Sequence, residues 1–284
     1  LHDALPILRR ISTLLEPEGR VAGQPVRLVE NADIAFQGCI VLGMGFVLDR
    51  AEARDWIATD PRNAEVLFPY LNGEDLNSRP DFSASRWVID FNDRAEAVAA
   101  TYPQPYARVE ARVKSERQRV NRKALRQRWW QYAEKRPGLR KAIAGLDEVL
   151  VIALVSKTVM PVRVPTGQVF SHALGVFATD SYADQGVLSS TLHQLWAIKF
   201  GSGMRNDPRY TPSDVFETFP RPAPTAELER MGRVLDEQRR GIMLRRKLGL
   251  TKLYNLVNDP DCSSASNADV ARMREIHVEL DHVV

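Results

Sequence analysis

Residues 148–179, EVLVIALVSKTVMPVRVPTGQVFSHALGVFAT, limit the fold of this chain more than any other segment. They contain three or four short runs of Val, Ile, Leu and Phe, which polar residues and the turn sequence Pro165-Thr166-Gly167 separate. Short apolar runs between turn residues are typical of strands that are buried in a sheet. The segment therefore predicts a sheet in the middle of the chain.

The sequence before this segment alternates between strand and helix patterns. We expect strands at 26–30, 34–48 and 86–91, which are rich in β-branched and aromatic residues. Asp49 is a suitable N-cap for a helix from Arg50 to about Thr59, which Asp60 and Pro61 would end.

Two further helices are expected to carry many basic residues. The sequence YPQP at 102–105 would end one helix and begin the next, because proline is tolerated in a first turn but not in a helix interior. This helix would continue to Val120. A second basic helix would occupy 124–135 and stop at Pro137 and Gly138.

A helix and a loop are expected after the strand-rich segment. The helix would cover 184–200, with Leu188, Leu192, Leu195 and Trp196 on one face. Residues 201–212, GSGMRNDPRYTP, contain too many Gly and Pro residues for a regular element and are predicted to form a loop.

The pattern changes after Pro224. Apolar residues then recur at heptad-like spacing in two groups: Leu228, Met231, Leu235 and Ile242, and Val270, Met273, His277, Leu280 and Val284. We expect two long helices, which the segment LGLTKLYNLVNDPDCSSASN would join.

These patterns together predict an α/β (α+β) body with a mixed sheet, followed by a helical C-terminal arm. We divide the chain into a truncated linker or artefactual start at 1–25, the body at 26–223 and the arm at 224–284. LHDALPIL at the beginning looks like adaptor-derived translation, so residues 1–7 carry no structural weight.

The positive charge is concentrated in one part of the chain. Residues 108–141 contain thirteen Lys or Arg and three Glu, a formal charge of +10, whereas the whole chain of 284 residues carries +3. The remainder must therefore sum to −7. A basic block in an otherwise acidic protein indicates a polyanionic partner, of which DNA or RNA is the first candidate. The alternative is a solvated helical face, but the adjacent Trp129 and Trp130 are unusual on such a face.

Other features of the composition exclude several classes of protein. No apolar run approaches the roughly 18 residues that cross a bilayer, so no membrane partner is expected. The two cysteines, Cys39 and Cys262, are far apart, which excludes a disulfide framework and suits a reducing cytoplasm.

The sequence motifs of several enzyme classes are missing. Gly43 and Gly45 lack the third glycine of a dinucleotide-binding turn, and a strand bend explains them better. There is no phosphate-binding loop, no nuclease metal motif and no paired His or Cys ligands. The five histidines are scattered, and the pair at 277 and 282 is expected on a solvated helix face; they are His2, His172, His193, His277 and His282. We therefore expect no cofactor, metal or catalytic residue in this chain.

Several phrases, in their order and spacing, resemble a known family. They are FQGCIVLGMGFVL, PYLNGEDLNSRP, SRWVIDF, YPQPYARV, KSERQRVNRKALRQRWWQYAEKRPGL, VSKTVMPVRVPTGQVFSHALGVFA and RYTPSDVFETFP. They are similar to the target-recognition region of single-chain DNA adenine methyltransferases of the Type IIL (MmeI-like) restriction-modification group. GLTKLYNLVNDPD and the last helix resemble the C-terminal segment of the same family, so the resemblance covers about 27–284.

The resemblance implies that this chain is the C-terminal part of a larger enzyme. An upstream methyltransferase domain would bind S-adenosylmethionine, and a nuclease region could precede it. Asn206-Asp207-Pro208-Arg209-Tyr210 only superficially matches the Asn-Pro-Pro-aromatic loop of adenine methyltransferases. Double-stranded DNA is then the expected partner.

The basic block has an expected role in this setting. Methylation of a base requires its rotation out of the duplex, so the protein must hold the DNA backbone. The residues suited to phosphate contacts are Lys114, Arg117, Arg119, Arg122, Lys123, Arg126 and Arg128. Neighbours on a helix point about 100° apart, so we expect Trp129 or Trp130 to anchor this helix in the core rather than stack on a base.

The resemblance also places base recognition in the loop at 201–212. Two positions just before Arg209-Tyr210-Thr211 fall on Arg205 and Asp207, and Asn206 and Arg209 complete the candidate set. Arg can donate to guanine O6 and N7 while Asp accepts from cytosine N4, so the pair could read one G·C base pair. An exposed ion pair in the loop is the alternative.

Two other functions remain open from the sequence. One is an RNA-binding or scaffold protein with a basic body and a helical arm, although no RNP-like aromatic cluster is found. The other is an autonomous enzyme whose site has no familiar motif.

Overall fold

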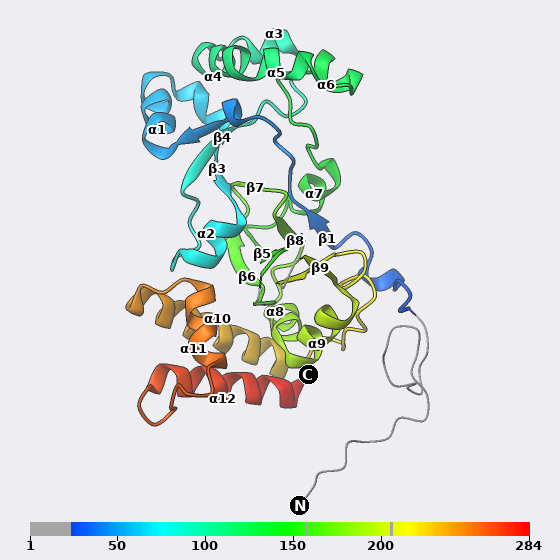
Figure 1. Ribbon diagram of the computed structural model, residues 1–284, viewed down its shortest axis with the longest axis vertical. Coiled ribbons are helices and arrows are strands. Elements are labelled where there is room, and N and C mark those ends of the chain that lie inside the picture. The colour runs from blue at the N-terminus through cyan, green and yellow to red at the C-terminus, as the bar shows by residue number, and fades with distance from the viewer. Residues whose placement is uncertain (1–23, 157, 205–206) are drawn as a thin grey trace, which may run out of the picture.

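The computed structural model describes residues 24–156, 158–204 and 207–284, without the side chains of 203–208. Two four-stranded sheets follow one another along the long axis of the molecule, and helices cover both ends (Figure 1). The predicted mixed α/β architecture with a helical C-terminal region is confirmed.

The first sheet contains most of the strand-rich segment and is antiparallel. Its strands, in spatial order, are β1 (Ala35–Gln37), β8 (Leu174–Phe177), β5 (Glu148–Ala153) and β6 (Val162–Pro165). Val149 and Val151 of β5 belong to the core under the C-terminal helices, and Leu150 and Ile152 belong to a second core on the opposite face. Both faces of the strand are covered, which explains its unbroken apolar sequence.

The second sheet contains one parallel pair and is therefore mixed. Its strands, in spatial order, are β2 (Val47–Asp49), β4 (Arg86–Ile89), β3 (Leu67–Leu71) and β7 (Val169–Phe170). β3 is antiparallel to β4 and parallel to β7. The predicted strand at 86–91 is confirmed by β4.

The two predicted strands before residue 49 are wrong in different ways. Residues 24–28 are irregular and lead into the short helix η1 (Val29–Asn31), because buried Asn31 donates to the carbonyls of Phe216 and Phe219 and holds the chain there. The predicted strand at 34–48 is divided between the two sheets. Leu42 and Gly43 have positive φ values of 50° and 132°, and the turn η2 (Met44–Phe46) then precedes β2.

Short helices form the end of the molecule beyond the second sheet (Figure 1). Those before the basic block are α1 (Arg50–Thr59), η3 (Pro61–Glu65) and α3 (Glu96–Ala99), while α2 (Gly73–Ser78) lies between the sheets and the C-terminal helices. α1 has the predicted bounds, although the Asp49 side chain makes no capping hydrogen bond. Asp60 instead caps η3 by accepting from the amide of Arg62.

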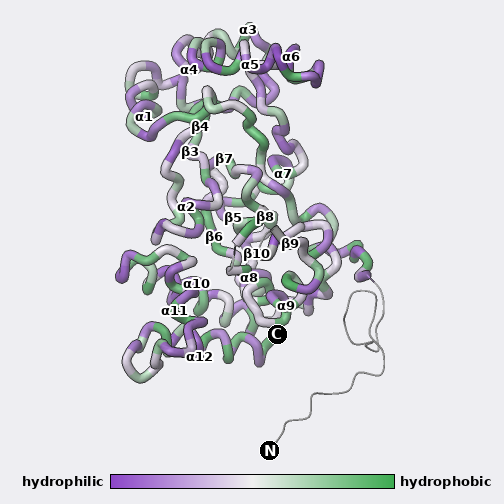
Figure 2. The backbone as a smooth tube through the Cα atoms, in the orientation of Figure 1, coloured by the Kyte–Doolittle hydropathy of each residue, from purple (hydrophilic) through white to green (hydrophobic). Residues whose placement is uncertain are grey.

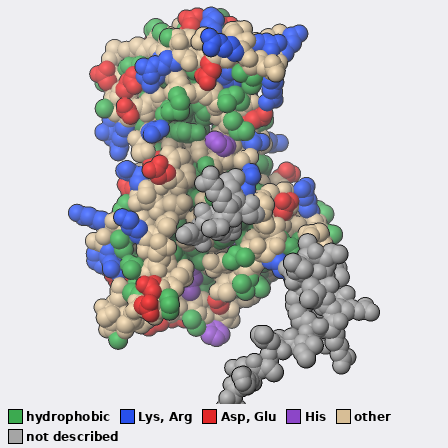
Figure 3. Space-filling model, viewed as in Figure 1, with side chains coloured by type: hydrophobic (Ala, Val, Ile, Leu, Met, Phe, Trp, Pro, Cys, Tyr) green, Lys and Arg blue, Asp and Glu red, His purple; other side chains and the backbone are tan. Residues whose placement is uncertain are grey.

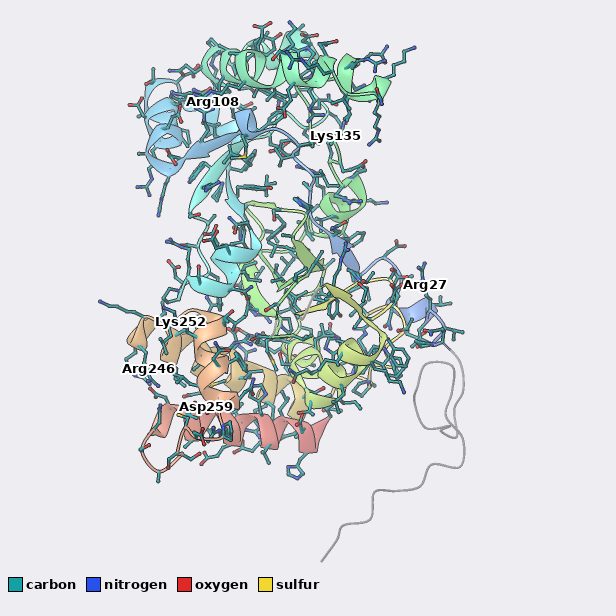
Figure 4. All side chains as sticks on the ribbon, viewed as in Figure 1. Arg27, Arg108, Lys135, Arg246, Lys252 and Asp259 are labelled. Carbon is teal, nitrogen blue, oxygen red and sulfur yellow. The ribbon has the colours of Figure 1, made fainter. Side chains whose placement is uncertain are left out.

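The first predicted basic helix is confirmed as three consecutive segments. They are α4 (Pro103–Val109), the π-helical η4 (Glu110–Lys114) and α5 (Ser115–Gln118). Gly45 lets η4 pack on the bend before β2, because a Cβ at Gly45 would lie 2.6 Å from Val113 Cγ2. Arg108 also joins α4 to the neighbouring elements: it donates to Glu52 Oε1 at 2.6 Å and to the Val47 carbonyl at 2.7 Å (Figure 4).

The second predicted basic helix, at 124–135, is wrong. Only α6 (Lys123–Gln127) is helical, and the chain is irregular until α7 (Pro137–Ala142). Trp129, Trp130 and Tyr132 are all buried in one cluster. A helix would point successive side chains about 100° apart, so an irregular backbone is needed to bury all three together.

The predicted helix at 184–200 is two helices, α8 (Tyr182–Ser189) and α9 (Thr191–Phe200). Ser190 has an extended backbone, and its hydroxyl accepts from the His193 amide, which begins the second helix. The predicted face is also wrong, because Leu188 is buried whereas Leu192 and Leu195 are exposed.

The predicted loop at 201–212 contains a short hairpin. Strands β9 (Ser202–Met204) and β10 (Asp207–Arg209) pair antiparallel. A proline is tolerated in β10 because the sheet has only two strands, so β10 is an edge strand. An isolated bridge between Val155 and Arg209 attaches β10 to the chain just beyond β5.

The C-terminal region has three helices where two were predicted. They are α10 (Ala226–Arg246), α11 (Leu250–Asn258), which forms within the predicted joining segment, and α12 (Ala268–Val283). Figure 2 shows polar and apolar residues alternating along α10 and α12. The predicted apolar residues of α10 are buried, as are Val270, Met273 and Leu280 of α12. In the part of the chain that the structure describes, no helix is both long and apolar enough to span a membrane.

Candidate nucleic-acid interface

The exposed residues of the predicted phosphate-binding set lie at the end of the molecule formed by α3–α6. Figure 3 shows Lys and Arg side chains gathered there. Arg119, Lys123 and Arg128 are exposed, and no acidic partner is found for them among the described residues. Arg122 is also exposed and pairs with Glu134 at 2.8 Å, which lowers the pKa of the Glu134 carboxyl. These four residues offer positive charge to a ligand in solvent.

Two residues of the predicted phosphate-binding set are partly engaged within the protein. Lys114 pairs with Glu110 at 2.8 Å, which raises the Lys114 pKa, and its ammonium lies 4.7 Å from the centre of the Trp129 ring. Arg126 donates from Nη1 to the carbonyls of Val120 and Asn121 at 2.7 and 2.8 Å. These bonds close the turn between α5 and α6.

Arg117 is not available to a phosphate in this structure, which corrects the prediction for that residue. Only 1% of it is exposed, and its Nη2 donates to the carbonyls of Val41, Leu42 and Gln131 at 2.9, 2.7 and 3.3 Å. Burial lowers the pKa of its guanidinium. The three carbonyls belong to the irregular segments that precede β2 and α7, so Arg117 holds these segments together.

The paired tryptophans both anchor the basic segment in the core. Trp129 and Trp130 are buried, with ring centres 5.9 Å apart in an edge-to-face arrangement. The indole of Trp130 donates to the Arg94 carbonyl at 2.9 Å, as does the amide of Gln131 at 3.0 Å. The expectation of a core role is met by both residues, and neither presents its ring for base stacking.

A buried His–Tyr pair fixes the chain directly after the hairpin β9–β10. Tyr210 follows β10, and its hydroxyl lies 3.1 Å from His193 Nε2. His193 Nδ1 must donate to the Leu188 carbonyl at 2.7 Å, so Nε2 accepts from the tyrosine. Burial lowers the His193 pKa to about 4, which keeps the imidazole neutral near pH 7. The base of the hairpin is therefore fixed by contacts to α8 and α9.

Two of the residues predicted to read bases, Asp207 and Arg209, belong to β10. Arg205 and Asn206 lie outside the described residues, and only the backbone of Asp207 is described. Arg209 is exposed and lines two adjacent cavities of about 230 and 270 Å³. Its backbone forms a bridge with Val155, just beyond β5, so Arg209 lies beside the first sheet.

The structure brings two further polar residues to the same surface. Gln37 of β1 and His172 of the β7–β8 turn line the smaller cavity with Arg209. Gln37 Nε2 donates to the His172 carbonyl at 2.8 Å, and Arg136 Nη2 donates to Gln37 Oε1 at 3.0 Å. The sequence did not indicate that Gln37 or His172 belongs to the candidate interface. The only signal was for His172, a polar residue in a turn between two apolar runs.

The glycines that were considered for a nucleotide-binding turn pack against a helix instead. Gly43 and Gly45 lie so close to Val113 and Arg112 that no space for a phosphate group is left beside them. Among residues 24–156, 158–204 and 207–284, no group of three or more His, Cys, Asp or Glu could hold a metal ion. His277 is not solvated as predicted: its Nε2 lies 2.9 Å from the Tyr254 hydroxyl, and burial lowers its pKa to about 4.

Comparison with solved structures supports the fold. A structure of the Type IIL restriction-modification enzyme MmeI in complex with DNA aligns with a TM-score of 0.68 and 17% sequence identity, over 97% of this chain and 35% of that chain. At this identity the similarity shows a common fold. The type IIG restriction endonuclease BpuSI aligns over 91% of this chain and 31% of its own, at 12% identity and a TM-score of 0.38, too low to show a common fold.

Comparison with sequences identifies the family. The search of curated proteins gave no match. Residues 27–223, more than half of the chain, match the family model described as "MmeI, target recognition domain". This range includes both sheets, the basic segment and the hairpin. The chain therefore belongs to the MmeI target-recognition-domain family.

Proposed function

We propose that this chain recognises a specific sequence in double-stranded DNA and positions the duplex for an adenine-N6 methyltransferase domain of the same, longer enzyme. The family match over residues 27–223 carries this proposal. The chain spans 35% of the aligned MmeI chain, so the remaining length can contain a separate catalytic domain. S-adenosylmethionine would bind to that domain. It would supply the methyl group, and the present chain would supply affinity and sequence choice.

Affinity is assigned to the exposed basic end of the molecule. Arg119, Arg122, Lys123 and Arg128 are accessible, and Lys114 and Arg126 are partly so. Side chains of this kind contact phosphates and fix the position of a protein on a duplex without reading its sequence. Each phosphate contact releases counterions, so binding should weaken as salt increases.

Sequence choice is assigned to the hairpin and the surface beside it. Arg205 and Asn206 come between β9 and β10 in the sequence, Asp207 is the first residue of β10, and exposed Arg209 is its last. Gln37 and His172 border the same cavity as Arg209, so they could contact bases next to those read by the hairpin. A two-stranded ribbon of this size is narrow enough to enter a major groove.

The first test is the choice of nucleic acid by the 284-residue chain. Fluorescence anisotropy at several salt concentrations would compare duplex DNA, duplex RNA and single strands of one sequence. We expect duplex DNA to bind best, with a steep decrease as salt rises. Stronger binding to duplex RNA or to single strands would favour the RNA-binding alternative and reject the proposal.

The second test addresses base recognition in the complete enzyme. Exchange of the charges, Arg205→Glu with Asp207→Arg, should replace G·C by C·G at one position of the methylated sequence. A mismatch at a recognised position costs roughly 1–3 kcal/mol, enough to change which sites are methylated. Mapping of methylated adenines would detect this, and retention of the original sequence at an unchanged rate would exclude the pair from base recognition.

A further inference from the structure

The turn between β1 and β2 has an apolar tip, formed by Leu42 and Met44. Leu42 is 48% exposed and Met44 is 68% exposed, whereas Val41 and Phe46 on either side of them are buried. Figure 1 shows the chain running from β1 to the end of the molecule formed by α3–α6 before it enters β2. The apolar tip is therefore exposed at the basic end of the molecule, and the residues at its base are anchored in the core.

The backbone conformation of Leu42 is one that leucine adopts at a cost. Its φ of 50° lies in the left-handed region, where the Cβ of an L-residue comes too close to the backbone. Asn and Gly accept this conformation more readily. A side chain that is half exposed offsets only part of the cost through burial. The stability of the fold therefore does not explain a leucine here, and strain of this kind points to a function.

Two arginines of the basic segment hold the turn on both sides. Arg117 Nη2 donates to the carbonyls of Val41 and Leu42 at 2.9 and 2.7 Å. Arg108 Nε donates to the Gly45 carbonyl at 3.2 Å. The backbone of the turn is thus fixed, so little conformational entropy would be lost when the apolar tip enters a ligand.

The charge around the turn favours DNA as the ligand of the apolar tip. A Cβ at Gly45 would lie 2.7 Å from Arg112 Cβ, so Arg112 starts directly beside the turn. Arg112 is exposed and has no acidic partner among the described residues, and exposed Arg119 lies two positions beyond Arg117. Proteins that enter a base stack combine such groups, because the cations neutralise phosphates while apolar side chains separate neighbouring base pairs.

We propose that Leu42 and Met44 insert between neighbouring base pairs of the bound duplex. This inference rests on the proposed function, because it takes duplex DNA as the ligand. Insertion partly unstacks one base step and bends and untwists the duplex, and contacts between the apolar tip and the bases offset the cost. An unstacked step also makes it easier to rotate a nearby base out of the duplex.

Closure of a nicked plasmid measures the untwisting and does not require the recognised sequence to be known. Ligase would seal the plasmid while the 284-residue chain is bound, and the topoisomers would be separated after the protein is removed. Each untwisted site then contributes to negative supercoiling. We expect supercoiling to rise with the amount of bound chain. Leu42→Asn with Met44→Asn should return the topoisomers to those of a plasmid that is closed without protein.

The same double variant controls for folding and for phosphate contacts. Because Asn accepts a φ of 50° more readily than Leu, the variant should unfold at the same temperature or a higher one. The slope of log K against log salt should be unchanged, since no phosphate contact is removed. Leu244→Asn is the matched control, because Leu244 is 49% exposed on α10, towards the opposite end of the molecule, and its replacement should leave the supercoiling unchanged.

The outcomes separate the insertion from the proposed function. Binding of the unmodified chain without any change in topoisomers, or an equal change in the double variant, would overturn the insertion and leave the proposed function standing. A failure to bind duplex DNA at any salt concentration would overturn the proposed function and the insertion with it. A dimer of the unmodified chain that the double variant does not form, detected by sedimentation, would assign the apolar tip to a second copy and also overturn the insertion.

Discussion

At the scale of single residues, basic side chains with nearly the same sequence context have different roles. Arg117 and Arg119 are two positions apart, yet Arg117 is buried on three backbone carbonyls while Arg119 is exposed. The carbonyls of the irregular segments accept from Nη2 of Arg117, whereas its Nε and Nη1 are buried without a hydrogen-bond partner among the described residues. These carbonyls are what offsets the burial of the guanidinium. The position of a residue relative to the core therefore decides whether its charge is used within the fold or is accessible to a ligand.

This difference predicts separate effects on stability and on DNA binding. Arg117→Ala should lower the free energy of unfolding by about 2–4 kcal/mol, because three carbonyls lose a donor and two of them are in buried hydrogen bonds. Arg119→Ala with Arg128→Ala should leave stability unchanged and reduce the slope of log K against log salt by about 0.9 for each phosphate that the variant no longer neutralises. Thermal unfolding and salt-dependent anisotropy measure the two quantities. An unchanged melting temperature for Arg117→Ala would contradict the structural role.

At the scale of secondary-structure elements, the contact between α8 and α10 depends on a glycine in each helix. A Cβ at Gly232 would lie 1.8 Å from the Tyr182 carbonyl oxygen, and Gly186 lies directly opposite. Gln185 donates to Asp236 Oδ1 at 2.8 Å across the same contact. The close approach lets the C-terminal region pack on the helix that follows the first sheet.

Alanine substitutions in α10 should show this requirement. Gly232→Ala forces α10 away from α8 and should destabilise the protein by about 1–3 kcal/mol. Gly241→Ala in the same helix is the matched control, because no atom lies within 4 Å of the added Cβ. It should stabilise the helix by up to about 1 kcal/mol. Chemical denaturation of both variants would check the prediction, and equal effects would argue against the close contact.

At the scale of the whole molecule, the C-terminal helices complete the core of the first sheet. One buried cluster contains side chains of the sheet and of the C-terminal helices, so it spans the predicted domain boundary at residue 224. The sheet contributes Val149, Val151 and Val164, and the helices contribute Met231, Leu235, Leu253 and Met273. Buried Arg239 adds a polar contact by donating to the Pro161 carbonyl at 3.0 Å. The helices therefore depend on the sheet, and the sheet depends on the helices.

Removal of residues 226–284 should consequently leave an unstable body. One face of β5, β6 and β8 would lose its covering side chains and become exposed to water. We expect the truncated chain to aggregate on expression or to bind a hydrophobic dye such as ANS strongly. Sedimentation and dye fluorescence would test this. A soluble truncated chain with the melting temperature of the full chain would show that the helices are independent of the sheet.

The sequence alone determined the class of fold, several of the regular elements and the family. Short apolar runs and heptad-like spacing indicated the fold class and these elements, because burial on one face repeats with the period of the element. α1, β4 and β5, α10 and α12 were predictable for this reason. The order and spacing of several phrases indicated the family.

The tertiary structure decided the elements whose conformation depends on distant partners. Residues 128–136 are irregular because Trp129, Trp130 and Tyr132 share one core, and 34–48 is divided because its ends belong to different sheets. The residues of the candidate interface were likewise only partly predictable from the sequence. Charge identified the basic segment, but only the packing showed that Arg117 is buried and that Gln37 and His172 lie beside Arg209.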